Sequence, residues 1–588
     1  MMDWRRKRAL NGDPAPQTRV LENLLHQGRV SNSGLLKIIK TLRDASAEGF
    51  FELPTENEFH AAFYRRFVKL ARSVTLELEN GPDFVLEYVE PSLLFAELVA
   101  ENEHLATLIE NSIDENGDIE FSLIVAYDEF APGNKLQYDN RRKVMVSSFS
   151  FREFQQAALA EDTNWITPLI LRSCILSKVK GGWSHVLKLL LNKLLFGPQG
   201  LATAGVPLQL PRRGIYLFKA KLTNILSDGD GLRMGYDWRG HASLKPCFIH
   251  HNVWMKNSDI AGRSRNGVEI TCSDASKFLR WGKADVASTV DLLSAGKARW
   301  DSGQWTKAKF DNLQKVVGIN FNEKGLLWDR ALRDHYDLPG CFRYDWVHCL
   351  LQDGTFTCEA WLYLNVNAVL PETMCAYLKA PSWAFPAARH EKSKLLHRVF
   401  DSYRTSPGDD AGKLKCSASE LLSLYGLIRH YAETQLPEEE SAARKSFMAS
   451  CEVLDLLMLC KRGIAAPAET AAQLRVATAK HLRLHLEAHG SSGVRPKHHW
   501  VLDIPDQILQ DGLLLDSFVI ERKHLHVKAI AEHVKNTHVF ERSVLAGVTN
   551  VHMQRARECT DAALRGRRKQ WGAAVLAPHM AFLGLQVG

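Results

Sequence analysis

The pattern of hydrophobic and polar positions changes twice along the chain. Over residues 14–110 apolar side chains recur at helical intervals, which predicts an N-terminal helical region, 1–110. The break "GRVSNSG" within residues 18–45 could join two helices either as a DNA-binding helix–turn–helix or as a simple packing unit. From residue 118 onward, apolar runs rich in β-branched residues take over and predict strands.

The predicted strands follow one another in a distinctive order. Strands are expected in "DIEFSLIVAYDEF" (118–130), "KVMVSSFSF" (143–151) and "WITPLILRSCIL" (165–176), a helix over 181–197, and a further strand over 214–231. Strand, strand, strand, helix, strand is the order of a ribonuclease-H-like core, although other folds share it. We therefore expect a mixed α/β protein with a core in residues 111–254, a mainly helical insertion, 255–495, and a core completion, 496–550.

Composition and charge indicate in which compartment the protein works. The 588 residues carry a formal net charge of +7, and the eleven cysteines form no CxxC pair, which favours a reducing compartment over a disulfide framework. The first eight residues are charged and lack the apolar core of a secretion signal, so we expect a soluble intracellular protein. Basic runs at 4–8, 140–144 and in the tail, 551–588, could be solvated surface, phosphate contacts or a nuclear address.

Three acids stand where a metal site could form. Asp128 and Asp228 come at the ends of predicted strands, and Glu521 lies on a predicted amphipathic helix. A carboxylate at the end of a buried strand is costly unless it is paired or binds a metal, and clustered carboxylates are typical ligands of Mg²⁺. The alternative is that these acids merely begin loops, and Glu129 and Asp230 compete for the same roles.

Four short blocks resemble the CACTA-type (En/Spm-like) DDE transposases. They are "IVAYDEFAPGNKL" (124–136), the first-acid segment; "LSDGDGLRMGYDWRGHASLKPCFIHHNV" (226–253), the second-acid segment; "YDWVHCLLQDGTF" (344–356); and "KHHWVLDIP" followed by "GLLLDSFVIERKH" (497–524), the last-acid motif. They occur in the family's order and span about residues 120–550.

The resemblance implies a ribonuclease-H-like core with Asp128, Asp228 and Glu521 holding Mg²⁺ or Mn²⁺. The implied chemistry is hydrolysis of double-stranded DNA at transposon ends and attack of the free 3′-hydroxyl on target DNA, in the nucleus and by a homodimer. A catalytically inactive, domesticated DNA-binding descendant is the alternative, and a helical scaffold is a third. Residues expected to meet the DNA backbone are Lys523, His524, Lys528, Arg141 and Arg142.

A structural zinc site is also implied. In related transposases and the V(D)J recombinase, two cysteines follow the second acid and two histidines precede the third. The matching positions here are Cys247, His250, His498 and Asp503, a departure from the family pattern, although all four side chains can ligate Zn²⁺. His251 and His499 are close enough in sequence to substitute.

The third block, residues 344–356, contains one more pair of candidate site residues. The resemblance places Asp345 and His348 near the active site, where they would orient DNA or a catalytic acid. The alternative is an aspartate that caps a helix beside a partly buried histidine.

Overall fold

The chain divides into two compact units. The structure, a computed structural model, describes residues 64–117, 119–132, 142–255, 266–379, 399–400, 414–436, 441–534 and 536–564, without the side chains of 241 and 558–564. Unit 1 comprises the described parts of 1–224, 323–329 and 518–567, and unit 2 those of 225–322 and 330–517. Several expected features lie outside the described residues: the helix–turn–helix within 18–45, the basic run at 4–8 and, beyond Leu564, the basic run at 564–570. Of the basic run at 140–144, positions 142–144 are described and Arg141 is not.

A five-stranded mixed sheet has the order β11-β8-β3-β4-β5. Its strands are β3 (Phe121–Phe130), β4 (Val144–Phe151), β5 (Ile166–Arg172), β8 (Ala220–Ser227) and β11 (Phe342–Tyr344). β3, β4 and β5 form an antiparallel meander, whereas β11 runs parallel to β8. The three strands predicted from 118 to 176 and a strand ending just before Asp228 are thereby confirmed.

The sheet is held by apolar burial on both faces. Every residue of β4 and of the edge strand β5 is buried, as expected of strands covered on both faces. In unit 1, Phe151 and Phe218 contact both Phe95 and Phe121, with ring centroids 4.4–6.1 Å apart, and aromatic rings of this kind contribute much of a core's stability.

Unit 1 contains two hairpins besides its part of the sheet. β1 (Ala71–Leu76) pairs with β2 (Phe84–Val89), and β6 (Val206–Leu210) pairs with β7 (Gly214–Phe218). The expected helical structure over 14–110 is therefore wrong at 71–89, where polar and apolar residues alternate around Gly81. Likewise, the strand expected over 214–231 is two strands with different partners.

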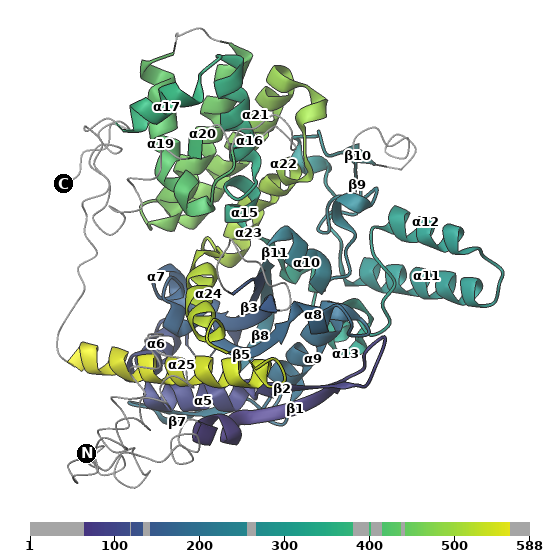
Figure 1. Cartoon of the computed structure of the whole chain (residues 1–588), viewed down its shortest axis with the longest axis vertical. Helices are drawn as coiled ribbons and strands as arrows, with labels where there is room; N and C mark the ends of the chain where they lie inside the picture. Colours follow the sequence, from purple (N-terminus) through teal and green to yellow (C-terminus); the bar gives the residue numbers. More distant parts are fainter. Residues whose placement is uncertain are drawn as a thin grey trace. The chain divides into compact units, whose positions relative to one another are not determined.

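Helices complete unit 1. They are α5 (Pro91–Glu101), α6 (Glu103–Asn116), α7 (Gln155–Leu159), α8 (Ser173–Leu176), α9 (Gly182–Phe196), α24 (Phe518–Ala531) and α25 (Phe540–Leu564). α25 passes α5 and β5 (Figure 1) and continues through residue 550, where we had expected a separate tail to begin.

Unit 2 is mainly helical, as predicted for the insertion. A bundle of α16 (Thr355–Val366), α19 (Ala418–Thr434), α20 (Ala442–Lys461) and α21 (Pro467–His489) is joined by α17 (Pro371–Leu378) (Figure 1). Shorter elements are α10 (Gly229–Gly235), α13 (Arg330–His335), α14 (Leu338–Cys341), α15 (Trp346–Leu350), α22 (Pro496–Trp500), α23 (Ile504–Asp511), β9 (Val253–Trp254) and β10 (Val268–Glu269). The prediction missed β11, a strand that joins the sheet from within this region.

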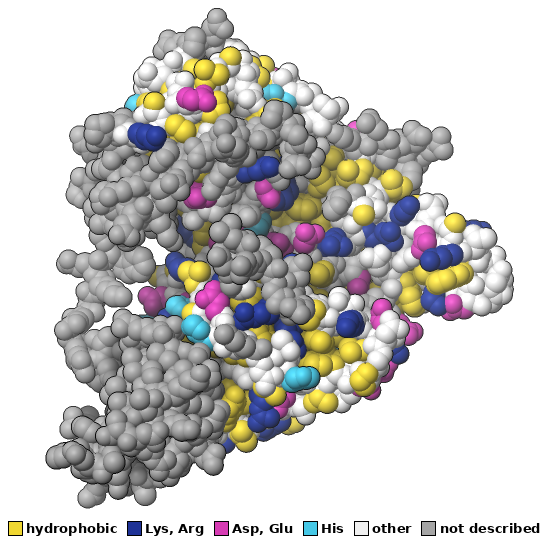
Figure 2. Space-filling view, viewed as in Figure 1, with side chains coloured by type: hydrophobic (Ala, Val, Ile, Leu, Met, Phe, Trp, Pro, Cys, Tyr) yellow, Lys and Arg dark blue, Asp and Glu magenta, His cyan; other side chains and the backbone are white. Residues whose placement is uncertain are grey.

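A helical hairpin of unit 2 carries an exposed basic and aromatic loop. It consists of α11 (Lys283–Asp301) and α12 (Lys307–Val317), at the right in Figure 2, where Lys and Arg side chains lie among hydrophobic ones. The Arg299 guanidinium and the Lys309 ammonium lie 5.2 and 4.7 Å from the Trp305 ring centroid, distances of cation–π contacts. Across all described residues, helices that combine enough length with enough apolar character to cross a bilayer are absent.

Candidate functional site

Two aspartates of unit 2 follow paired residues of parallel strands. Ser227, the last residue of β8, pairs with Tyr344, the last residue of β11. Asp228 and Asp345 are the next residues, so their backbones leave the sheet side by side. Asp228 caps α10 by accepting from the Gly231 amide at 2.5 Å, and the chain turns from strand into helix at this point.

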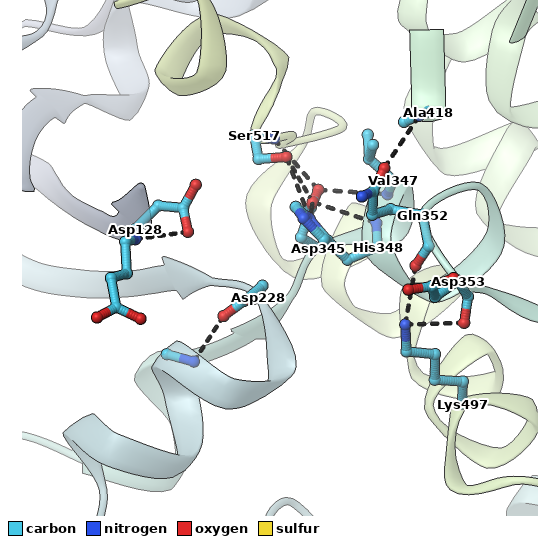
Figure 3. Close-up of polar contacts among 12 residues, drawn as sticks. Asp128, Asp228, Asp345, Val347, His348, Gln352, Asp353, Ala418, Lys497 and Ser517 are labelled. Carbon is cyan, nitrogen blue, oxygen red and sulfur yellow. Dashed lines mark hydrogen bonds and ion pairs between the residues drawn. The ribbon is translucent and has the colours of Figure 1, made fainter. Parts of the chain in front are cut away.

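Asp345 is the more deeply buried of the two and has several polar partners. Its carboxylate caps α15 and accepts from His348 Nδ1 at 2.5 Å and from Ser517 Oγ at 2.6 Å (Figure 3). Burial alone would raise its pKa, but the hydrogen bond and charge of His348 and the bond from Ser517 outweigh burial and lower it. Asp345 therefore stays ionised, and the helix-capping alternative describes its local geometry.

Asp128 and the predicted helix of Glu521 meet within unit 1. Asp128 lies near the end of β3, and its Oδ2 is 3.5 Å from Nδ1 of His524 on α24. The His524 ring packs on Phe130, with centroids 4.5 Å apart, and burial lowers the pKa of His524 to about 3. Glu521 lies one helical turn before His524 on α24, and α24 packs on β3.

The rival acids have other partners. Glu129 accepts a hydrogen bond from Ser173 and lies 2.5 Å from the Lys143 ammonium. Asp230 is 71% exposed and pairs with Arg233 one turn along α10. These contacts account for both carboxylates locally.

The residues expected to contact DNA are largely turned toward protein groups. Lys523 is buried and donates to the carbonyls of Asp162 and Trp165, and burial lowers its pKa to about 8. Arg142 donates to the carbonyls of Ala531 and Val534 at the end of α24. His524 is buried as described above, and the Lys528 ammonium lies 5.4 Å from the Phe130 ring centroid.

The first buried cluster of metal-ligand type comprises Cys247, His250, His499 and Asp503. All four residues are buried in unit 2, and one ligand atom from each lies within 4.8 Å of the others. His250 Nδ1 is 3.5 Å from Cys247 Sγ and 3.4 Å from His499 Nε2, and His250 Nε2 is 3.5 Å from Asp503 Oδ1. Such a group could hold a metal ion.

The cluster corrects one member of the expected ligand set. His499, given above as a substitute, takes the place of His498, and His251 is not part of the group. His499 and Asp503 are four residues apart, so one continuous helical turn presents both to the same side, whereas His498 faces elsewhere.

Burial disfavours a charge on each of the four groups of this cluster. Burial raises the pKa of the Cys247 thiol and of the Asp503 carboxyl and lowers the pKa of His250 to about 2 and of His499 to about 3. A divalent ion would balance one thiolate and one carboxylate, and both imidazoles would be free of the protons that compete with a metal.

Tyr344 connects this cluster to the strand ends. Its hydroxyl donates to Cys247 Sγ at 3.5 Å and accepts from the Phe248 amide at 3.4 Å, and its ring stacks on Trp500 at 5.0 Å. Tyr344 directly precedes Asp345. A cation held by the cluster would therefore fix the backbone that carries Asp345 and, through strand pairing, the backbone before Asp228.

A second buried group was missed by the sequence reasoning. Glu359 on α16 and His481 and His485 on α21 have ligand atoms within 4.8 Å of one another, and such a group could also hold a metal ion. The signal in the sequence was the four-residue spacing of the two histidines, which puts both on one helical face. Their acidic partner is more than a hundred residues away and could not be found from spacing.

The sequence of this chain has no match among known families or curated proteins. No family model matches the sequence, and no curated protein is significantly similar to it.

Proposed function

We propose that the chain is a transposase-like DNA nuclease and strand transferase that works with two divalent metal ions. Asp128, Asp228 and Glu521 would hold the ions, Mg²⁺ or Mn²⁺. One ion would activate the attacking water or 3′-hydroxyl, and the other would stabilise the leaving oxygen. The carboxylates supply hard oxygen ligands, as these cations require.

The observation that carries the proposal is the position of two acids on neighbouring strands. Phe121 N donates to Lys219 O, and Thr223 Oγ1 donates to Leu123 O, so β3 and β8 start together and run in the same direction. Asp128 comes late in β3, and Asp228 directly follows β8. An antiparallel meander whose first strand borders a parallel fourth strand, with a fifth outside it, is the strand order of a ribonuclease-H-like core.

Further contacts support parts of the site. The contact of His524 with Asp128 supports α24, and hence Glu521, as the source of the third acid. The pairing of β8 with β11 supports Asp345 as a residue that positions Asp228, with His348 keeping it ionised. We assign zinc to the Cys247 cluster, because a Cys/His/His/Asp set suits Zn²⁺ and a fully buried site suits a structural ion.

DNA contacts are proposed for the α11–α12 hairpin. Exposed Lys and Arg side chains of this hairpin, among them Arg299, Lys307 and Lys309, can neutralise phosphates. The proposed substrate is double-stranded DNA, acted on in the nucleus by a homodimer that would bring two element ends together.

Nicking of supercoiled plasmid by the full chain, with Mg²⁺ or Mn²⁺, tests the proposal. We expect metal-dependent nicking that Asp128→Asn, Asp228→Asn and Glu521→Gln each reduce to background. Asp230→Asn is the matched control, since this acid lies two residues from Asp228 but is exposed, and it should nick like the wild type. Equal activity in all five proteins would refute the assignment. DNA binding without any nicking would favour the inactive, domesticated alternative.

A further inference from the structure

We infer that Glu359, His481 and His485 form a second metal centre, independent of the proposed nuclease site, that binds Zn²⁺ within the helical bundle of unit 2. Two imidazoles and one carboxylate are an established donor set for this ion. The centre would join α16 to α21.

The geometry brings the donors together around one carboxylate. Glu359 Oε2 is 2.7 Å from His485 Nδ1 and 3.4 Å from His481 Nε2, and its Oε1 is 3.5 Å from Nε2 of His489, one further turn along α21. The side chains of Glu359 and His485 are fully buried. Every ion-pair partner of Glu359 among the described residues is a histidine, so Lys or Arg does not compensate this buried charge there.

Several polar atoms at this place lack hydrogen-bond partners within the described structure. They are the Nε2 atoms of His485 and His498, together with Glu359 Oε1 and His489 Nε2, which face each other at 3.5 Å without a hydrogen bond. A buried polar atom without a hydrogen bond destabilises the fold, so several of them gathered in one cluster point to a missing ligand.

His498 indicates what would complete the coordination. Its Nδ1 accepts from the Arg495 amide at 3.0 Å, so in the neutral ring the proton is on Nε2, which cannot then ligate a metal. The ring lies against His485, with centroids 4.4 Å apart. A water bound as fourth ligand would give the Nε2–H of His498 an acceptor, and three protein ligands plus water is a known zinc arrangement.

The two clusters share the short helix α22. His498 faces the Glu359 group, while the next residue, His499, belongs to the Cys247 group. Two metal ions would thus hold one five-residue helix from two directions. A network of Glu359 with protonated histidines is the metal-free alternative that the experiment has to exclude.

Metal content of the purified full chain, measured by plasma mass spectrometry after dialysis against metal-free buffer, tests the inference. We expect two zinc ions per wild-type chain, one in Glu359→Gln and His485→Asn, and one in Cys247→Ser. His430→Asn, a half-buried histidine of the same bundle on α19, is the matched control and should keep two. Wild-type metal content in Glu359→Gln and His485→Asn would overturn the inference.

Cobalt substitution separates the centres even if one variant folds poorly. Cobalt bound by the Cys247 cluster should show a thiolate-to-cobalt charge-transfer band, whereas cobalt at Glu359 should show d–d bands alone. Cys247→Ser loaded with Co²⁺ should therefore retain one equivalent without the charge-transfer band. Absence of any cobalt spectrum in this variant, together with a single equivalent in the wild type, would refute the second centre. Metal content and cobalt spectra are measured independently of plasmid nicking. Failure of the nuclease proposal would therefore leave these outcomes unaffected.

Discussion

Loss of one buried carboxylate should unfold unit 2 much more easily. Arg343 on β11 and Asp511 at the end of α23 form a two-pronged ion pair, with Nε–Oδ2 and Nη2–Oδ1 distances of 2.8 and 2.9 Å, and both side chains are 2% exposed. In Asp511→Asn the guanidinium would stay buried without its counter-charge. Removing one partner of such a pair typically costs about 3–5 kcal/mol.

The assay is urea unfolding of the full chain, followed by tryptophan fluorescence and far-UV circular dichroism. Asp301→Asn is the control, because Asp301 pairs with Lys297 in the same unit but is 57% exposed, and an exposed helical pair of this spacing contributes only about 0.3–0.5 kcal/mol. The double variant Arg343→Met with Asp511→Leu should recover most of the loss, since no charge is left buried. If Asp511→Asn and Asp301→Asn shift the unfolding midpoint equally, the reasoning is wrong.

Three further predictions follow from single contacts. His552 donates a hydrogen bond to the Thr163 carbonyl, and burial lowers its pKa to about 3. Its contribution to stability is therefore complete above pH 6.5 and is lost as the pH falls toward 3. In urea titrations, the free energy of unfolding of the wild type should fall by about 2 kcal/mol more than that of His552→Gln between pH 7 and pH 5. Gly231→Ala would place a Cβ 2.0 Å from Ser227 Oγ and 2.9 Å from Asp228 Oδ1, so the turn that carries Asp228 would have to shift. Plasmid nicking should slow on the order of 10²-fold, and unchanged nicking would argue against Asp228. Ser417→Ala removes the capping hydroxyl of α19 and should lower the free energy of unfolding by about 1 kcal/mol, measured in urea, with an unchanged midpoint contradicting the cap.

Long apolar segments were readable from the sequence, and short ones were not. β3, β4 and β5 have seven to ten residues each, enough for a buried strand to stand out from its neighbours. β11 has three residues and follows the proline-containing turn of α14, so no periodicity exists to detect. The β1–β2 hairpin did alternate, but the regular apolar spacing on either side of it favoured helix.

The acids could be proposed from sequence because strand ends are local features, but their partners could not. Nothing in the spacing links Asp128 to His524, or Asp345 to Ser517, which are 172 residues apart. Such contacts depend on how distant helices pack on the sheet. The resemblance supplied the order of the acids and the region of the Cys247 cluster, whereas the Glu359 group had no counterpart in it.

Helical geometry would have chosen the right histidine in the Cys247 cluster. At about 100° per residue, positions four apart differ by roughly 40° around a helix, and positions five apart by roughly 140°. His499 and Asp503 can therefore face one ion together, while His498 and Asp503 point to different sides. The same rule places His481 and His485 on one face of α21. The wrong choice of His498 and the missed Glu359 group therefore have one cause, since the family motif was given more weight than the angular spacing of residues on a helix.

The small size of the elements near Asp228 and Asp345 explains why so many buried polar groups gather there. β11 has three residues and α15 and α22 have five each, and elements this short have no stability of their own. The apolar area that they can bury is correspondingly small. Directional bonds therefore have to fix them: the Arg343 ion pair holds β11, the Asp345 cap holds α15, and two metal ions would hold α22. The catalytic metal ions that we propose would need that rigidity, because a strand end that shifts by an ångström would lose the coordination.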